Sequence, residues 1–73
     1  MQFVVRNYTT KEFNILPTLE DAQLMVEYLS EWYPDKKLTI VAPMVNLHEF
    51  EDKLMASGWA LGHVDLRKLR GES

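Results

Sequence analysis

An amphipathic helix bounded by two prolines is the sequence feature that most restricts how this chain can fold. Between Pro17 and Pro34, apolar residues recur at three- and four-residue spacing, which is typical of a helix with one wide apolar stripe. Thr18 is suited to be its N-cap, and Asp21 completes a variant capping box. The rest of the chain must supply a surface that buries this stripe. The stripe consists of Ala22, Met25, Val26, Leu29, Trp32 and Tyr33. We expect Trp32 and Tyr33 at the core and its rim.

Four other segments have the composition or alternation of strands. Residues 2–8 are rich in β-branched and aromatic side chains, and residues 13–16 read as the returning arm of a hairpin. Residues 38–42 form a short apolar run, which is typical of a central strand. Residues 58–67 alternate with period two, so we expect a last strand there.

A second helix is predicted between Asn46 and Gly58. Asn46 forms a cap pair with Glu49, and Gly58 is suited to a left-handed C-terminal stop. The order is then β-β-α-β-α-β, in a single small domain spanning residues 1–73. Each helix has one apolar stripe. We therefore expect an α+β fold of two layers, with both helices on one face of a four-stranded mixed sheet.

This arrangement would leave the other face of the sheet uncovered. Strand parity places five candidate partner-binding residues on that face: Arg6, Tyr8, Trp59, His63 and Arg67. Together with nearby valines they would form an apolar patch larger than a lone subunit usually exposes. The same parity directs Phe3, Val5, Phe13, Ile15, Leu38, Ile40, Val64 and Leu66 toward the helices, and Val4, Thr39 and Val41 toward the uncovered face.

The charge of the chain is unevenly distributed along the sequence. The formal net charge is −3, which is too small to classify the whole chain as a nucleic-acid binder. Residues 12–35 contain acidic residues and no Lys or Arg, whereas residues 67–70 contain three bases. Two interpretations remain open: a solvated acidic helix with a basic tail, or a bipolar surface that steers a charged partner.

No set of residues in the sequence predicts catalysis, and we expect no enzyme activity. Cysteine is absent, and His48 and His63 lie on different predicted elements. His48 with Asp52 has helical i, i+4 spacing, but an ordinary surface pair is the favoured interpretation over a metal site. The three glycines match no phosphate-binding motif. We therefore predict no catalytic, cofactor-binding or metal-binding residues.

The sequence also favours a cytoplasmic protein without a membrane partner. The stretch MQFVVRNYTT lacks the basic region of a signal peptide. No apolar run approaches the roughly 20 residues that span a bilayer. The lack of cysteine fits a reducing compartment.

Residues 13–42 resemble a family of small bacteriophage proteins. The run FNILPTLEDA, followed by a helix ending in WYP and by a strand, is similar to the strand–helix–strand core of short phage inhibitors of bacterial RNA polymerase. Residues 44–73 are extra to that pattern. The resemblance implies a compact, enzymatically inert protein that binds and inhibits or redirects a larger host complex in the host cytoplasm. It assigns no functional residues.

Three functions are therefore considered. The leading hypothesis is a non-enzymatic protein-binding module that regulates or inhibits a larger partner. The alternative is a small nucleic-acid-binding protein in which Tyr8 and Trp59 stack bases on the open sheet face. The further alternative is a homo-oligomeric structural module, such as a homodimer, joined through that face or a sheet edge.

Overall fold

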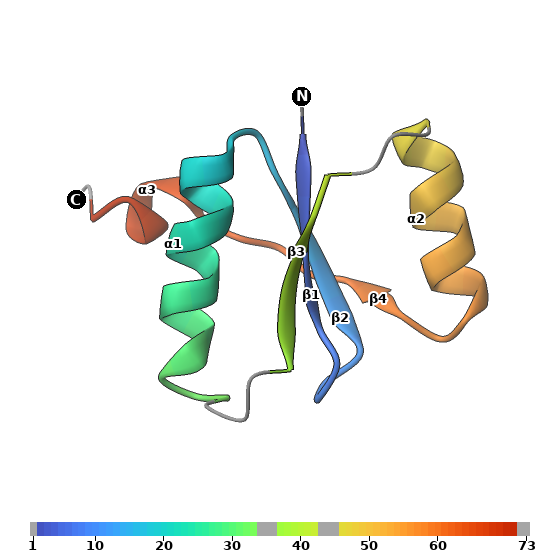
Figure 1. The fold of residues 1–73 in the computed structure, drawn as a ribbon, viewed down its shortest axis with the longest axis horizontal. Helices are drawn as coiled ribbons and strands as arrows, with labels where there is room; N and C mark the ends of the chain where they lie inside the picture. Colours follow the sequence, from blue (N-terminus) through green and yellow to red (C-terminus); the bar gives the residue numbers. More distant parts are fainter. Residues whose placement is uncertain (1, 34–36, 43–45, 72–73) are drawn as a thin grey trace.

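A four-stranded mixed sheet with helices on both sides forms the protein (Figure 1). The computed structural model describes residues 2–33, 37–42 and 46–71. The sheet order is β3-β1-β2-β4, in which β1 is antiparallel to β2 and β3, and β4 is parallel to β2. The predicted α+β class and four-stranded mixed sheet are confirmed. The strands are β1 (Phe3–Asn7), β2 (Glu12–Leu16), β3 (Leu38–Val41) and β4 (Ala60–Leu61).

The two long helices begin at the predicted caps. Before α1 (Leu19–Ser30), the Thr18 hydroxyl accepts a hydrogen bond from the backbone N–H of Asp21 at 3.1 Å. Before α2 (Leu47–Ala56), the Asn46 side chain accepts one from the N–H of His48 at 2.9 Å. Gly58 follows α2 with φ of 90°, a left-handed conformation that glycine adopts without strain. Local capping chemistry therefore sets the limits of these helices.

The hairpin turn sets which side chains of β1 and β2 share a face. The Asn7 side chain accepts hydrogen bonds from the N–H groups of Thr9 and Thr10, and this Asx turn begins the loop between the strands. In the resulting register Arg6 lies opposite Phe13, so an even-numbered residue of β1 faces the same side as an odd-numbered residue of β2. The prediction that Phe13 and Ile15 share a face with Val5 is therefore wrong.

Two small apolar cores lie on opposite faces of the sheet. Val5 and Leu16 pack with α1 residues on one face, whereas Val4 and Phe13 pack with Leu54 of α2 on the other. Figure 1 shows α1 and α2 on opposite sides of the strands. The prediction that both helices share one face, in two layers, is wrong. Because α2 covers the second face, the broad bare patch expected there does not exist.

Strand order explains why the helices separate. β2, β3 and β4 run in the same direction, and β3 and β4 are the two edges of the sheet. The chain crosses the sheet one way from β2 to β3 and the opposite way from β3 to β4. Right-handed crossovers that travel in opposite directions place their helices on opposite faces. The order of strands is not visible in the pattern of any one segment.

The end of the chain is helical where a strand was predicted. β4 stops at Leu61, and α3 (Leu66–Leu69) follows a short extended segment. The Asp65 carboxylate accepts hydrogen bonds from the N–H groups of Arg67 and Lys68 and so caps α3. The prediction of a strand to residue 67 is wrong. The hydrogen bonds from the Asp65 cap favour a helical turn over the extended backbone that the alternating pattern predicted.

Gly62 allows β2 and the segment after β4 to approach closely. A Cβ atom at this position would lie 2.7 Å from the Asn14 side-chain oxygen, which is nearer than nonbonded atoms tolerate. The Asn14 side chain is buried on the same face as Val5 and Leu16. Gly62 therefore marks a close approach of the two segments, which a side chain at this position would obstruct.

Candidate protein-binding surfaces

Arg6, Tyr8 and Trp59 meet at one end of the sheet, and we call them the Arg6 cluster. The Arg6 guanidinium carbon lies 4.7 Å from the centre of the Tyr8 ring and 4.6 Å from that of Trp59. The two ring centres are 5.1 Å apart, and the rings meet at 74°. The guanidinium thus occupies the angle between two aromatic faces, where cation–π attraction holds it.

The positions of these three residues follow from the fold. Arg6 lies on the face of β1 that α2 covers, and Tyr8 follows the end of the strand. Trp59 comes directly after the glycine stop of α2, and its N–H donates to the Leu54 carbonyl at 2.9 Å. Its indole is half-buried against the core that includes Val4. Trp59 therefore belongs partly to the core and partly to the surface.

The backbone of two exposed lysines lies next to the cluster. The Lys37 carbonyl accepts from the Tyr8 N–H, and the Lys11 carbonyl accepts from the Ala60 N–H. The Arg6 Nε atom is buried without a hydrogen-bond partner, and no carboxylate in the described part of the chain pairs with the guanidinium. This end of the molecule is therefore suited to an anionic group.

His63 and Arg67 do not join the Arg6 cluster. Both are exposed and follow β4, and His63 borders a hollow beside α1. The five predicted residues thus divide into a cluster of three at the α2 face and two residues on the segment that packs against α1. Their separation follows from the early end of β4, after which strand parity no longer applies.

The hollow beside α1 has a volume of about 210 Å³, and we call it the α1–α3 groove. Its apolar floor comes from Met25, Val64 and Leu69. Tyr28, His63, Lys68 and Asp65 form its polar rim. The Asp65 carboxylate already accepts the N–H bonds that cap α3, and Lys68 is the cation of the rim.

Two aromatic residues, Tyr28 in the rim of this groove and Trp32 after the end of α1, are more exposed than the sequence indicated. Trp32 was expected in the core, but 68% of its surface is exposed. Tyr28, four residues earlier on the same side of α1, is 55% exposed. The prediction for Trp32 is wrong because α1 ends at Ser30, so Trp32 follows the helix and does not continue its buried stripe. The helical spacing of Tyr28 and Trp32 was the available signal.

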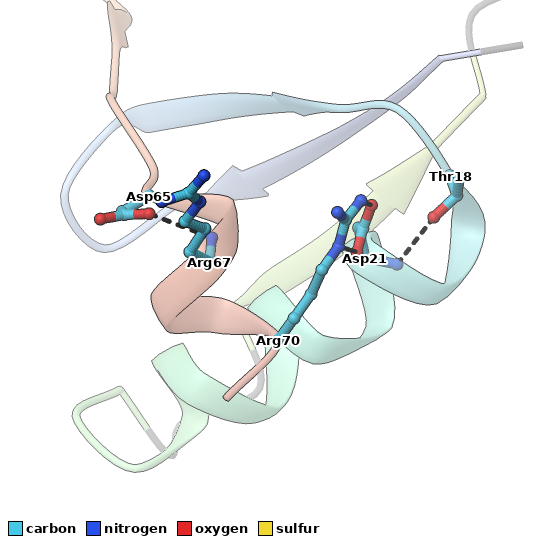
Figure 2. Close-up of polar contacts among 5 residues, drawn as sticks. All are labelled: Thr18, Asp21, Asp65, Arg67 and Arg70. Atoms are coloured by element: carbon cyan, nitrogen blue, oxygen red, sulfur yellow. Dashed lines mark hydrogen bonds and ion pairs between the residues drawn. The ribbon is translucent and has the colours of Figure 1, made fainter. Parts of the chain in front are cut away.

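An ion pair between the partly exposed Arg70 and the buried Asp21 joins the end of α3 to α1, as Figure 2 shows. The Arg70 Nε and Nη2 atoms donate to the two oxygens of Asp21 at 2.9 and 2.7 Å. The Arg70 guanidinium lowers the pKa of the Asp21 carboxyl below its ordinary value of 3.8; burial acts in the opposite direction, and the Thr18 hydroxyl adds a further lowering. The Asp21 side chain therefore serves this long-range pair, in place of the reciprocal cap predicted from the sequence.

The described residues contain no group of three or more His, Asp or Glu side chains that could hold a metal ion. His48 makes only a long contact with Glu51, with 3.9 Å between Nδ1 and the carboxylate oxygen. None of the helices in the described ranges is long and apolar enough to cross a membrane.

Comparison with known proteins adds no relative. No family model, curated protein or solved structure matches this chain. The resemblance of residues 13–42 to phage inhibitors therefore stays a prediction.

Proposed function

We propose that this protein is a non-enzymatic binding module that regulates or inhibits a larger partner protein through the Arg6 cluster. The observation that carries the proposal is the guanidinium of Arg6, fixed at the surface between Tyr8 and Trp59. Trp, Tyr and Arg are the residues most enriched among those that dominate binding energy at interfaces. A partner of this kind is also what the phage resemblance implies.

The chemistry of the cluster favours an acidic segment of the partner. The two rings restrict the guanidinium, so little conformational freedom remains to be lost when a carboxylate binds it. A carboxylate pairs with the planar guanidinium through two parallel hydrogen bonds, and Lys11 and Lys37 add attraction at longer range.

Nucleic acid is the second candidate, since aromatic rings beside cations also bind single strands. The geometry favours it less. Base stacking needs free ring faces, and the Arg6 guanidinium already covers a face of Tyr8 and of Trp59. The net charge of −3 also opposes binding to a polyanion.

The test is capture of the partner from native lysate on immobilised protein, followed by affinity measurement with variants. We expect Arg6→Gln and Trp59→Ala to weaken binding by about 30-fold or more, the loss typical of a dominant interface residue. Lys53→Gln is the control, because it removes an exposed cation of α2 that belongs to neither surface. Thermal unfolding of each variant separates lost binding from lost folding.

Three outcomes would contradict the proposal. Full binding by both cluster variants would exclude this surface. A captured partner that nuclease removes, with affinity falling steeply as salt is added, would support the nucleic-acid alternative. A doubled mass in light scattering that reverts to the monomer in Trp59→Ala would support the homo-oligomeric alternative.

A further inference from the structure

The α1–α3 groove lies apart from the Arg6 cluster. The groove lies on the face of the sheet that α1 covers, whereas the cluster lies on the face that α2 covers. Its function therefore does not depend on the function proposed for Arg6. We propose that the groove binds a segment of a partner protein that presents one large apolar side chain next to a carboxylate.

Size and lining determine the apolar part of this occupant. The groove measures about 210 Å³, and pockets for drug-sized ligands and cofactors have volumes of roughly 300–1,000 Å³. Its floor of Met25, Val64 and Leu69 is apolar. A single large apolar side chain fits these dimensions and gains free energy by leaving water.

The rim determines the charge of the occupant. The Lys68 ammonium makes no ion pair within the described residues, and the exposed Arg67 precedes it. The one carboxylate in the lining, Asp65, is engaged by two backbone N–H groups of α3. A carboxylate beside the apolar side chain would therefore meet an unpaired cation, with His63 able to donate a further hydrogen bond.

The aromatic surface next to the groove determines that the occupant is a peptide segment. Tyr28 belongs to the rim, and Trp32 follows the end of α1, four residues after Tyr28. They are the two most exposed large apolar side chains in the described chain, at 55% and 68%. A polypeptide that extends from the groove along α1 would cover both, whereas a small molecule confined to the groove would leave Trp32 in water.

The groove is held open before any partner binds. Arg70 pairs with Asp21 through two hydrogen bonds, and this pair fixes α3, one wall of the groove, to α1, the other (Figure 2). Leu66 and Leu69 of α3 also pack against the α1 core. A preformed site loses less entropy on binding than one that must first be ordered.

The experiment uses two small probes on the intact protein, followed by amide chemical shifts. N-acetyl-phenylalanine has an apolar ring and a carboxylate, and N-acetyl-phenylalanine amide is the same molecule without the charge. We expect saturable shifts at Val64, Lys68 and Leu69, with the acid binding about threefold more tightly, as for an exposed ion pair. Lys68→Gln should abolish the preference for the acid, and Lys53→Gln, an exposed lysine of α2, should keep it.

A peptide that extends the acid probe at its N-terminus tests the aromatic surface. It should bind more tightly than N-acetyl-phenylalanine and should lose that gain in Trp32→Ala, whose side chain is exposed and dispensable for the core. The proposal is overturned if no saturable shifts occur at the groove, if acid and amide bind equally, or if the shifts map to the Arg6 cluster. These results do not depend on the capture experiment proposed for the Arg6 cluster, so either proposal can fail while the other stands.

Discussion

Asp21 shows how a single residue can carry two structural tasks. Its backbone N–H donates to the Thr18 cap, and its side chain, only 4% exposed, accepts both hydrogen bonds from Arg70. The sequence indicated the first task, because capping depends on residues three positions apart. It contained no signal for the second, because the arginine lies 49 positions away.

The lowered pKa of Asp21 makes the stability of the fold depend on acid pH. A carboxyl whose pKa is lower in the folded state than in the unfolded state stabilises the fold above its ordinary value of 3.8. This contribution decreases as the pH falls from that value through the pKa of the folded protein. Urea unfolding should therefore show wild type more stable than Asp21→Asn by a constant amount above about pH 5, and by a decreasing amount below it.

Other carboxylates also titrate in this range, so the difference between the two proteins is the informative quantity. Asp21→Asn keeps the size of the side chain and leaves the Thr18 cap in place. A difference in the free energy of unfolding that stayed constant down to about pH 2 would contradict the role given to the Asp21–Arg70 pair.

At the scale of elements, the features that depend on neighbouring residues could be predicted from the sequence, whereas those that depend on long-range packing could not. The caps at Thr18 and Asn46 and the stop at Gly58 could be predicted, since each depends on residues within one turn. The helix α3 was missed because Asp65, Leu66 and Arg67 also fit the alternation of a strand. Periodicity over so short a segment is ambiguous, and the hydrogen bonds of the cap decide it.

Asp65→Ala should loosen α3 and leave the rest of the protein folded. Losing an N-cap costs about 1 kcal/mol, which corresponds to about fivefold faster local opening. Hydrogen exchange should show this acceleration at the amides of Leu69 and Arg70, whose N–H groups donate within the α3 segment. The Ala22 amide, in the first turn of α1, is the internal control. Equal acceleration at Ala22 would mean that α3 does not open separately.

At the scale of the whole molecule, the sheet separates two apolar cores and contributes side chains to both. Alternate residues of β1 serve opposite faces, so Val4 packs toward α2 and Val5 toward α1. The sequence predicted the strands and the amphipathic helices, but not the faces, because the face of each helix depends on the order of strands across the sheet. The candidate site was predicted in part: Arg6, Tyr8 and Trp59 meet, whereas Tyr28, Trp32 and Lys68 were found only in three dimensions.

Because the same strands line both cores, we expect the two cores to unfold together. Phe13→Ala truncates the core beneath α2 and should cost about 3–5 kcal/mol; Leu16→Ala truncates the core beneath α1 and should cost about 2–5 kcal/mol. In a Trp32→Phe background, Trp59 fluorescence reports the α2 side and far-UV circular dichroism reports the whole chain. Each truncation should shift both urea transitions equally. A fluorescence transition that moved alone in Phe13→Ala would show two independent cores.

The pairing of Asp21 with Arg70 also has a consequence for synthesis. A polypeptide emerges from the ribosome N-terminus first, so the carboxylate reaches solvent many residues before its cation has been translated. The strand that borders β2 and the helix that covers Phe13 emerge late as well. During elongation the first hairpin and α1 therefore lack their neighbours, and the nascent chain reaches its finished form only after residue 70 has cleared the exit tunnel.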